Sequence, residues 1–172
     1  MAEKTSAISL NRRQLLGATA ATGLALTSGP VAAAEGKPDL TGKSILITGC
    51  SSGFGYLGAI YYQTLGARVF ATMRNMPRKE ADELYGETMA EGPAFDILEL
   101  DVLSDESVAA AVAEAERLNG GALDVVINNA GIGTGAPVEL QDIETMRLLF
   151  DTNVMGYQRV ARASLPAMRA KK

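Results

Sequence analysis

The stretch TGCSSGFG, residues 48–55, connects a short apolar run to a segment with helical periodicity and contains three glycines. The run Ser44–Thr48 is apolar and β-branched, which predicts a buried strand. The following segment, Gly53–Leu65, is predicted to be a helix with a buried face of Leu57, Ile60, Tyr61 and Leu65. A bare loop between a strand and a helix N-terminus offers backbone amides that favour a phosphate group. A purely structural turn is the alternative.

The rest of the chain alternates between strand-like and helix-like segments. Further strands are predicted at Arg68–Met73, Ile97–Val102 and Leu123–Asn128. Helices are predicted at Arg78–Tyr85, after the N-cap Ser104, and from about Gln141 to Arg169. The helix after Ser104 has an apolar stripe of Val108, Ala111, Val112 and Ala115. The last helix has a stripe of Tyr157, Val160, Ala161, Ser164, Leu165 and Met168. This alternation predicts an α/β fold, a Rossmann-like doubly wound parallel sheet with strand order 3-2-1-4.

In such a sheet the loop after the first strand lies where ligands bind. Its glycines follow the spacing G-x-x-x-G-x-G, unlike the common dinucleotide fingerprint G-x-G-x-x-G, and no P-loop lysine follows. The second strand ends without the acid that would bind an adenosine ribose, and Arg74 comes next. Arg74 could contact a 2′-phosphate, which favours NADP over NAD; a solvated arginine is the alternative reading.

Four motifs in order make the chain similar to the classical short-chain dehydrogenase/reductase family: TGCSSGFG, LDV at 100–102, NNAG at 128–131 and DTNVMG at 151–156. The resemblance runs from about Lys43 to the last residue. It implies that the pyrophosphate of the cofactor is held by the loop residues Gly49, Ser51, Ser52, Gly53, Phe54 and Gly55. It also implies that Asp101 and Val102 flank the adenine, that Asn129, Ala130 and Gly131 border the cofactor, and that Asn153 is the asparagine of the catalytic tetrad.

The family resemblance implies a hydride transfer between nicotinamide and a small carbonyl or alcohol substrate, with a serine and a Tyr-x-x-x-Lys pair as the remaining catalytic groups. The lysine lowers the pKa of the tyrosine, which is otherwise near 10 and a poor base at neutral pH. None of the five tyrosines here has a lysine four residues later. We therefore expect a truncated form that ends before the catalytic segment. The alternatives are a non-catalytic dinucleotide-binding module and an inactive fragment.

Composition excludes several other classes. The chain of 172 residues has a net charge of −4, so it carries no basic character typical of nucleic-acid binding. It has no histidine and a single cysteine, Cys50, which predicts no metal site and no internal disulfide. Cys50 is expected to be a small loop residue, with a redox thiol as the alternative. A homo-oligomer is possible for the complete form.

Residues 1–34 have the order of an export signal: Arg12-Arg13, then the apolar stretch Leu15–Leu26, then small residues ending at Ala34. The arginine pair is similar to a twin-arginine (Tat) signal. The apolar stretch is too short and too rich in Ala, Thr and Gly for a stable membrane span. The sequence thus predicts a signal peptide over 1–34, a truncated NADP-binding domain over 40–172 and a periplasmic or extracytoplasmic location, with the cytoplasm as the alternative.

Overall fold

Four parallel strands form the centre of the fold, in the predicted order β3-β2-β1-β4. The computed structural model describes residues 36–88 and 92–171. The strands are β1 (Ser44–Ile47), β2 (Arg68–Met73), β3 (Phe95–Glu99) and β4 (Val125–Ile127). In the register of the sheet, Ile47 pairs with Ala71 on one side and with Ile127 on the other. The connections from β1 to β3 run toward one edge of the sheet, and β4 is then added on the other side of β1. In such a sheet, ligands bind at the point where the strand order changes direction, which here is between β1 and β4.

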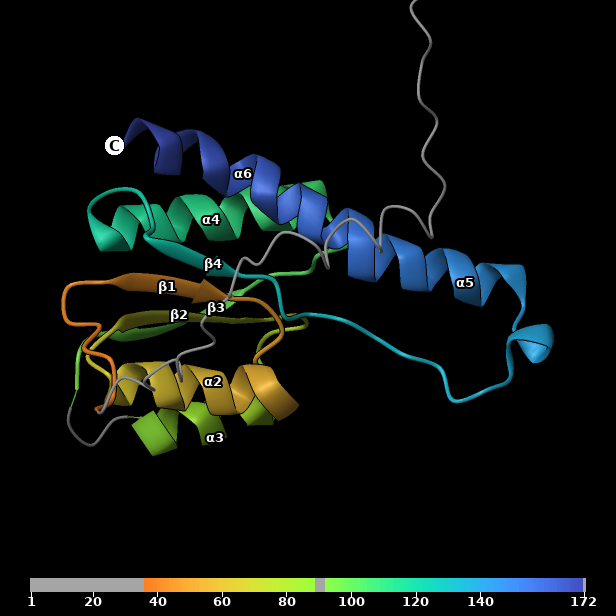
Figure 1. Cartoon of the computed structure of the whole chain (residues 1–172), viewed down its shortest axis with the longest axis horizontal. Helices are drawn as coiled ribbons and strands as arrows, with labels where there is room; N and C mark the ends of the chain where they lie inside the picture. Colours follow the sequence, from red (N-terminus) through yellow and green to blue (C-terminus); the bar gives the residue numbers. More distant parts are fainter. Residues whose placement is uncertain (1–35, 89–91, 172) are drawn as a thin grey trace, which may run out of the picture. The chain divides into compact units, whose positions relative to one another are not determined.

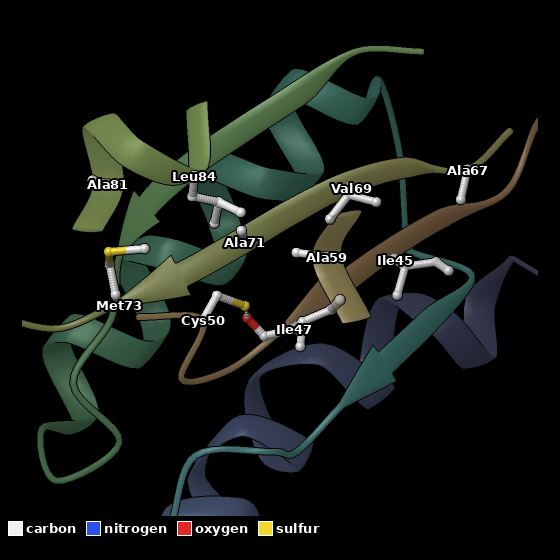
Figure 2. Close-up of a cluster of buried hydrophobic side chains, with 10 residues drawn as sticks. All are labelled: Ile45, Ile47, Cys50, Ala59, Ala67, Val69, Ala71, Met73, Ala81 and Leu84. Atoms are coloured by element: carbon white, nitrogen blue, oxygen red, sulfur yellow. Dashed lines mark hydrogen bonds between the residues drawn. The ribbon is translucent and has the colours of Figure 1, made fainter. Parts of the chain in front are cut away.

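Helices cover both faces of the sheet (Figure 1). Helices α2 (Gly53–Thr64) and α3 (Lys79–Thr88) lie on one face, and α4 (Asp105–Asn119) and α6 (Gly156–Ala170) lie on the other. Side chains of the strands alternate between the two cores, as strand geometry requires. Ile45 and Ile47 point into the core beneath α2, which Figure 2 shows, whereas Leu46 points into the core beneath α4.

Helix α4 follows the sequence pattern closely. Its buried residues are the predicted stripe Val108, Ala111, Val112 and Ala115. The hydroxyl of Ser104 accepts a hydrogen bond from the Ser107 amide at 3.1 Å and caps the helix. Gly120 ends the helix with a φ of 72°, a left-handed conformation that favours glycine.

The predicted buried face of α2 is correct only in part: Leu65 is buried and Ile60 packs against the core. Leu57 and Tyr61 are exposed, and the buried residues are Gly55, Ala59 and Gln63. Gly55 and Ala59 are small and let α2 approach the glycine loop and β2 closely, so Leu57 and Tyr61 are turned outward. The hydrophobic pattern assigned the large residues Leu57 and Tyr61 to the buried face because it contains no information about this close packing.

Other predicted elements differ in extent, and the fourth strand covers Val125–Ile127 rather than Leu123–Asn128. The third strand covers Phe95–Glu99 rather than Ile97–Val102, because residues after Glu99 turn toward the cap of α4 while Leu100 and Val102 stay buried. The helix predicted from about Gln141 to Arg169 is divided into α5 (Ile143–Phe150), a π-helical turn η2 (Asp151–Met155) and α6, and a 3-10 turn η1 (Val138–Leu140) precedes it. Of its predicted stripe, Val160 and Ser164 are buried and Leu165 is exposed.

The predicted signal peptide, residues 1–34, lies outside the described residues. Among the residues that are described, no helix combines the length and the apolar character needed to cross a bilayer.

Candidate functional site

The glycine loop is packed too tightly for larger residues at two positions. Gly49 has a φ of 73°, and a Cβ atom built there would lie 2.8 Å from the Cα of Ala130. A Cβ atom on Gly55 would collide with the carbonyl oxygen of Gly49 and the side-chain amide of Asn129. The loop between β1 and α2 therefore runs directly against the residues that follow β4. Glycine at positions 49 and 55 is a steric requirement of this contact.

Asn129 and Thr48 connect these two segments by hydrogen bonds. The Nδ2 of Asn129 donates to the carbonyl oxygens of Thr48 at 2.9 Å and Gly49 at 3.1 Å. The Oγ1 of Thr48 accepts from the backbone amides of Asn129 at 3.0 Å and Ala130 at 2.9 Å. Sequence analysis did not single out Thr48. Its signal was a hydroxyl at the end of a buried strand, next to the first glycine of the loop.

A cleft of about 310 Å³ opens at the carboxyl ends of the strands, within the usual range for small-molecule sites of about 300–1,000 Å³. Most of the predicted cofactor-binding residues line it: Gly49, Ser51, Ser52, Phe54, Arg74, Asp101, Val102, Asn129, Ala130 and Gly131. The lining also includes five residues that were not predicted: Met73, Leu100, Leu103, Ile132 and Thr152. Gly53 and Gly55 do not line it, because Gly55 is buried beneath the loop and Gly53 begins α2.

The adenine side of the predicted site is formed by the turn after β3. Its carboxylate is already engaged, since the Oδ1 of Asp101 accepts from the Leu103 amide at 3.0 Å. The Asp101 amide in turn donates to the Ser107 hydroxyl at 2.9 Å. Arg74 follows β2, the strand paired with β3, so it lies beside this turn; it is exposed, and its carbonyl accepts from Arg78 at 3.2 Å. A cationic side chain thus lines the cleft beside the turn after β3.

Asn153 lies in the π-helical turn η2 and clamps the segment after NNAG. Its Oδ1 accepts from the Ile132 amide at 2.9 Å, and its Nδ2 donates to the Ile132 carbonyl at 2.8 Å. The neighbouring Thr152 lines the cleft, whereas Asn153 contacts the lining residue Ile132. Single π-helical turns within helices are frequent at functional sites. The side chain of Asn153 therefore fixes the position of Gly131 and Ile132.

Cys50 belongs to the core rather than to the site. Its side chain is fully buried, and its Sγ donates to the Ile47 carbonyl at 3.3 Å, a pair drawn in Figure 2. Burial raises the pKa of the thiol to about 12. A thiol this hard to ionise is a poor nucleophile, which supports the structural reading over the redox alternative.

The geometry suits a ligand with phosphate groups and an extended shape. The loop amides and the N-terminus of α2 provide the anion-binding end. The close packing at Gly49 and Gly55 holds this loop against the residues that follow β4. Comparison with known proteins agrees: residues 43–172 match the short chain dehydrogenase family, and the chain belongs to that family.

Curated relatives match over about three quarters of the chain. Human retinol dehydrogenase 8 is 37% identical over 134 residues, which cover 76% of this chain and 41% of the relative. Human 17-beta-hydroxysteroid dehydrogenase type 1 is 34% identical over 131 residues, covering 74% of this chain and 39% of the relative. The chain thus spans about two fifths of the length of these proteins.

Solved structures show the same fold. A short-chain type dehydrogenase/reductase from Mycobacterium marinum has a TM-score of 0.71 at 29% identity, covering 77% of this chain and 53% of that one. An NADPH-bound carbonyl reductase from chicken fatty liver has a TM-score of 0.65 at 30% identity, covering 76% and 49%.

Proposed function

We propose that the chain is the cofactor-binding part of an NADP-dependent oxidoreductase that acts on a small carbonyl or alcohol substrate. The observation that carries this proposal is the cleft lined by part of the glycine loop, which hydrogen bonds from Asn129 hold in place. When bound there, a nicotinamide dinucleotide supplies or accepts a hydride. The residues of this chain bind and orient it: the loop amides hold the pyrophosphate, and Asn153 holds the wall at Gly131 and Ile132.

A fluorescence titration of the 172-residue chain with NADPH tests this proposal. We expect saturable binding of NADPH by the wild-type chain. Gly49→Val should abolish it, because the valine side chain would collide with Ala130 and displace the loop. Gly133→Val, in an open part of the chain where a Cβ meets nothing within 4 Å, is the matched control. Absence of NADPH binding by a folded wild-type chain would contradict the proposal.

Arg74 supports NADP over NAD within this proposal. Its guanidinium stands at the cleft rim, and a 2′-phosphate would gain charge-assisted hydrogen bonds from it, worth about 1.5–3 kcal/mol. Arg74→Asp should weaken NADPH binding about tenfold or more and affect NADH little. Arg162→Asp, an exposed position on α6, controls for the change in net charge. Equal losses for NADPH and NADH would assign Arg74 no role in selectivity.

Turnover by this family needs a tyrosine and lysine that the 172 residues do not contain as a Tyr-x-x-x-Lys pair. We therefore propose that these residues belong to a longer protein and that the chain by itself does not catalyse hydride transfer. The absent pair also favours a second candidate, a dinucleotide-binding module without chemistry. An in-frame continuation of the coding sequence past Lys172 that encodes Tyr-x-x-x-Lys supports the enzyme, and a stop codon supports the module.

We also propose export through the twin-arginine route, on the basis of Arg12-Arg13 and the apolar stretch after it. Replacement of both arginines by lysine should keep the protein in the cytoplasm. Fractionation of cells that express the two forms measures this. Equal export of both forms would remove the proposal and favour the cytoplasmic alternative.

A further inference from the structure

Arg159 connects three elements behind the adenine side of the cleft. Its guanidinium Nη1 donates to the Val102 carbonyl at 3.1 Å, and Nη2 lies 2.8 Å from Asp151. Its Nε is 3.6 Å from Asp105, the first residue of α4. One side chain of α6 therefore contacts the turn after β3, the start of α4 and the π-helical turn η2.

The same wall is also packed by close approach of the backbone. A Cβ atom on Gly156, the first residue of α6, would lie 2.9 Å from the Cβ of Val102. Val102 is thus pressed against the start of α6 and held there by the hydrogen bond from Arg159. Because Val102 lines the cleft while its carbonyl faces Arg159, a movement of this contact changes the shape of the cleft.

The exposure of the charged groups around Arg159 indicates which of its contacts holds the cleft wall in place. Asp105 and Asp151 are 73% and 44% exposed in their side chains, so water can solvate both carboxylates if the arginine is removed. Exposed ion pairs contribute little to stability. The Arg159 side chain itself is 21% exposed, and Val102 is buried. Loss of Arg159 therefore leaves a carbonyl without its donor at the cleft wall and affects global stability less.

We propose that Arg159 is a positioning residue that fixes the Val102 wall for the adenosine half of the cofactor and ties this wall to the turn that carries Asn153. The proposal rests on the function proposed above. It predicts an effect confined to one half of the ligand. The adenosine half meets the Val102 wall directly, whereas the nicotinamide half lies toward Gly131 and Ile132, which Asn153 holds independently.

Calorimetric titrations of the full 172-residue chain with two half-ligands test this. Arg159→Met should weaken binding of adenosine 2′,5′-bisphosphate about tenfold, the effect of one lost hydrogen bond to a charged donor, and change binding of reduced nicotinamide mononucleotide by less than about twofold. Arg162→Met, an exposed residue three positions along α6, is the matched control and should change neither. Melting curves ensure that each variant is folded at the titration temperature.

The outcomes separate this proposal from the function on which it rests. A folded wild-type chain that binds neither half-ligand nor NADPH overturns both. Normal wild-type binding with equal values for the R159M and R162M variants overturns the role of Arg159 alone. Equal weakening of both halves assigns Arg159 a general structural role and also overturns the proposal. If R159M does not fold, R159L, which also removes every donor, decides: several-fold weaker binding of the adenosine half supports the proposal, and wild-type binding contradicts it.

Discussion

Gly55 shows at the scale of one residue why the loop is so bare. It is buried under the loop at the start of α2, against the carbonyl of Gly49 and the amide of Asn129. Three residues further along the same helix, a Cβ on Gly58 would meet only the ring of Tyr62, at an ordinary 3.6 Å. Both glycines lie in the same helix, but the structure has room for a side chain at Gly58 and none at Gly55.

Gly55→Ala should therefore lower the free energy of unfolding by about 2 kcal/mol, since the new methyl group forces backbone or Asn129 to move. Gly58→Ala should raise it by about 0.5–1 kcal/mol, because alanine restricts the unfolded chain and favours helix. Urea denaturation of both variants beside wild type measures this. A Gly55→Ala variant as stable as Gly58→Ala would mean that the loop packs less tightly than described.

Cys50 gives a second prediction at this scale. With its thiol buried and its pKa raised to about 12, it should react with a water-soluble disulfide reagent at pH 8 only when the chain opens. We expect slow labelling in buffer and rapid labelling in concentrated urea. Rapid labelling of the folded chain would show that the loop exposes the thiol and would reopen the redox reading.

At the scale of secondary-structure elements, the side chain of Asp124 connects the start of β1 to the end of α6. Its Oδ2 accepts from the amide and the hydroxyl of Ser44 at the start of β1, both at 2.9 Å. Its Oδ1 lies 2.9 Å from the ammonium group of Lys171, just after α6. The hydrogen bond from Lys171 is the main cause that lowers the pKa of Asp124 to about 2, against the opposing effect of burial.

This lowered pKa predicts a pH-dependent contribution of Asp124 to stability. The carboxylate binds protons more weakly in the folded chain, so its stabilising effect is complete above the ordinary value of 3.8 and is lost as pH falls toward 2. Asp124→Asn should cost about 1.5–3 kcal/mol at pH 7. The difference from wild type should shrink between pH 4 and 2, measured by urea denaturation. Glu139→Gln, an exposed carboxylate in η1, is the control; an equal pH profile for both variants contradicts the prediction.

At the scale of the whole molecule, the described surface has an apolar region along α5 and η2. Ile143 is 65% exposed, Phe150 is 61% exposed and Met155 is 49% exposed. Within the described sheet, β4 pairs with β1 only, and Val125 on it is 39% exposed. Contiguous apolar surface and an open strand edge both favour association with other chains.

We therefore expect the isolated 172-residue chain to associate as its concentration rises. Ile143→Glu combined with Phe150→Glu should reduce this association, because charge makes burial of the α5 face unfavourable. Light scattering across a concentration series measures it, and Tyr85→Glu, an exposed aromatic residue on α3, is the control. A wild-type chain that stays monomeric throughout the series would contradict the expectation.

Much of the fold could be predicted because local patterns agreed with global packing. The stripe of α4 and its cap at Ser104 were read correctly, since a periodic apolar face and a capping hydroxyl act within one helix. The buried face of α2 was predicted only in part, since it depends on how closely the helix approaches the loop and β2. The π-helical turn η2 was also not predicted; it carries Asn153, whose hydrogen bond to Ile132 spans 21 residues of the chain.

The sequence by itself determined the parallel sheet, its strand order and the position of the glycine loop, because hydrophobic periodicity and glycine placement act along the chain. Only the tertiary structure decided what the loop touches. Thr48, Asn129 and Arg159 gain their roles from residues 57 to 82 positions away. Such contacts form only when the strands are paired, since hydrogen-bond geometry across elements depends on distances that no local pattern encodes.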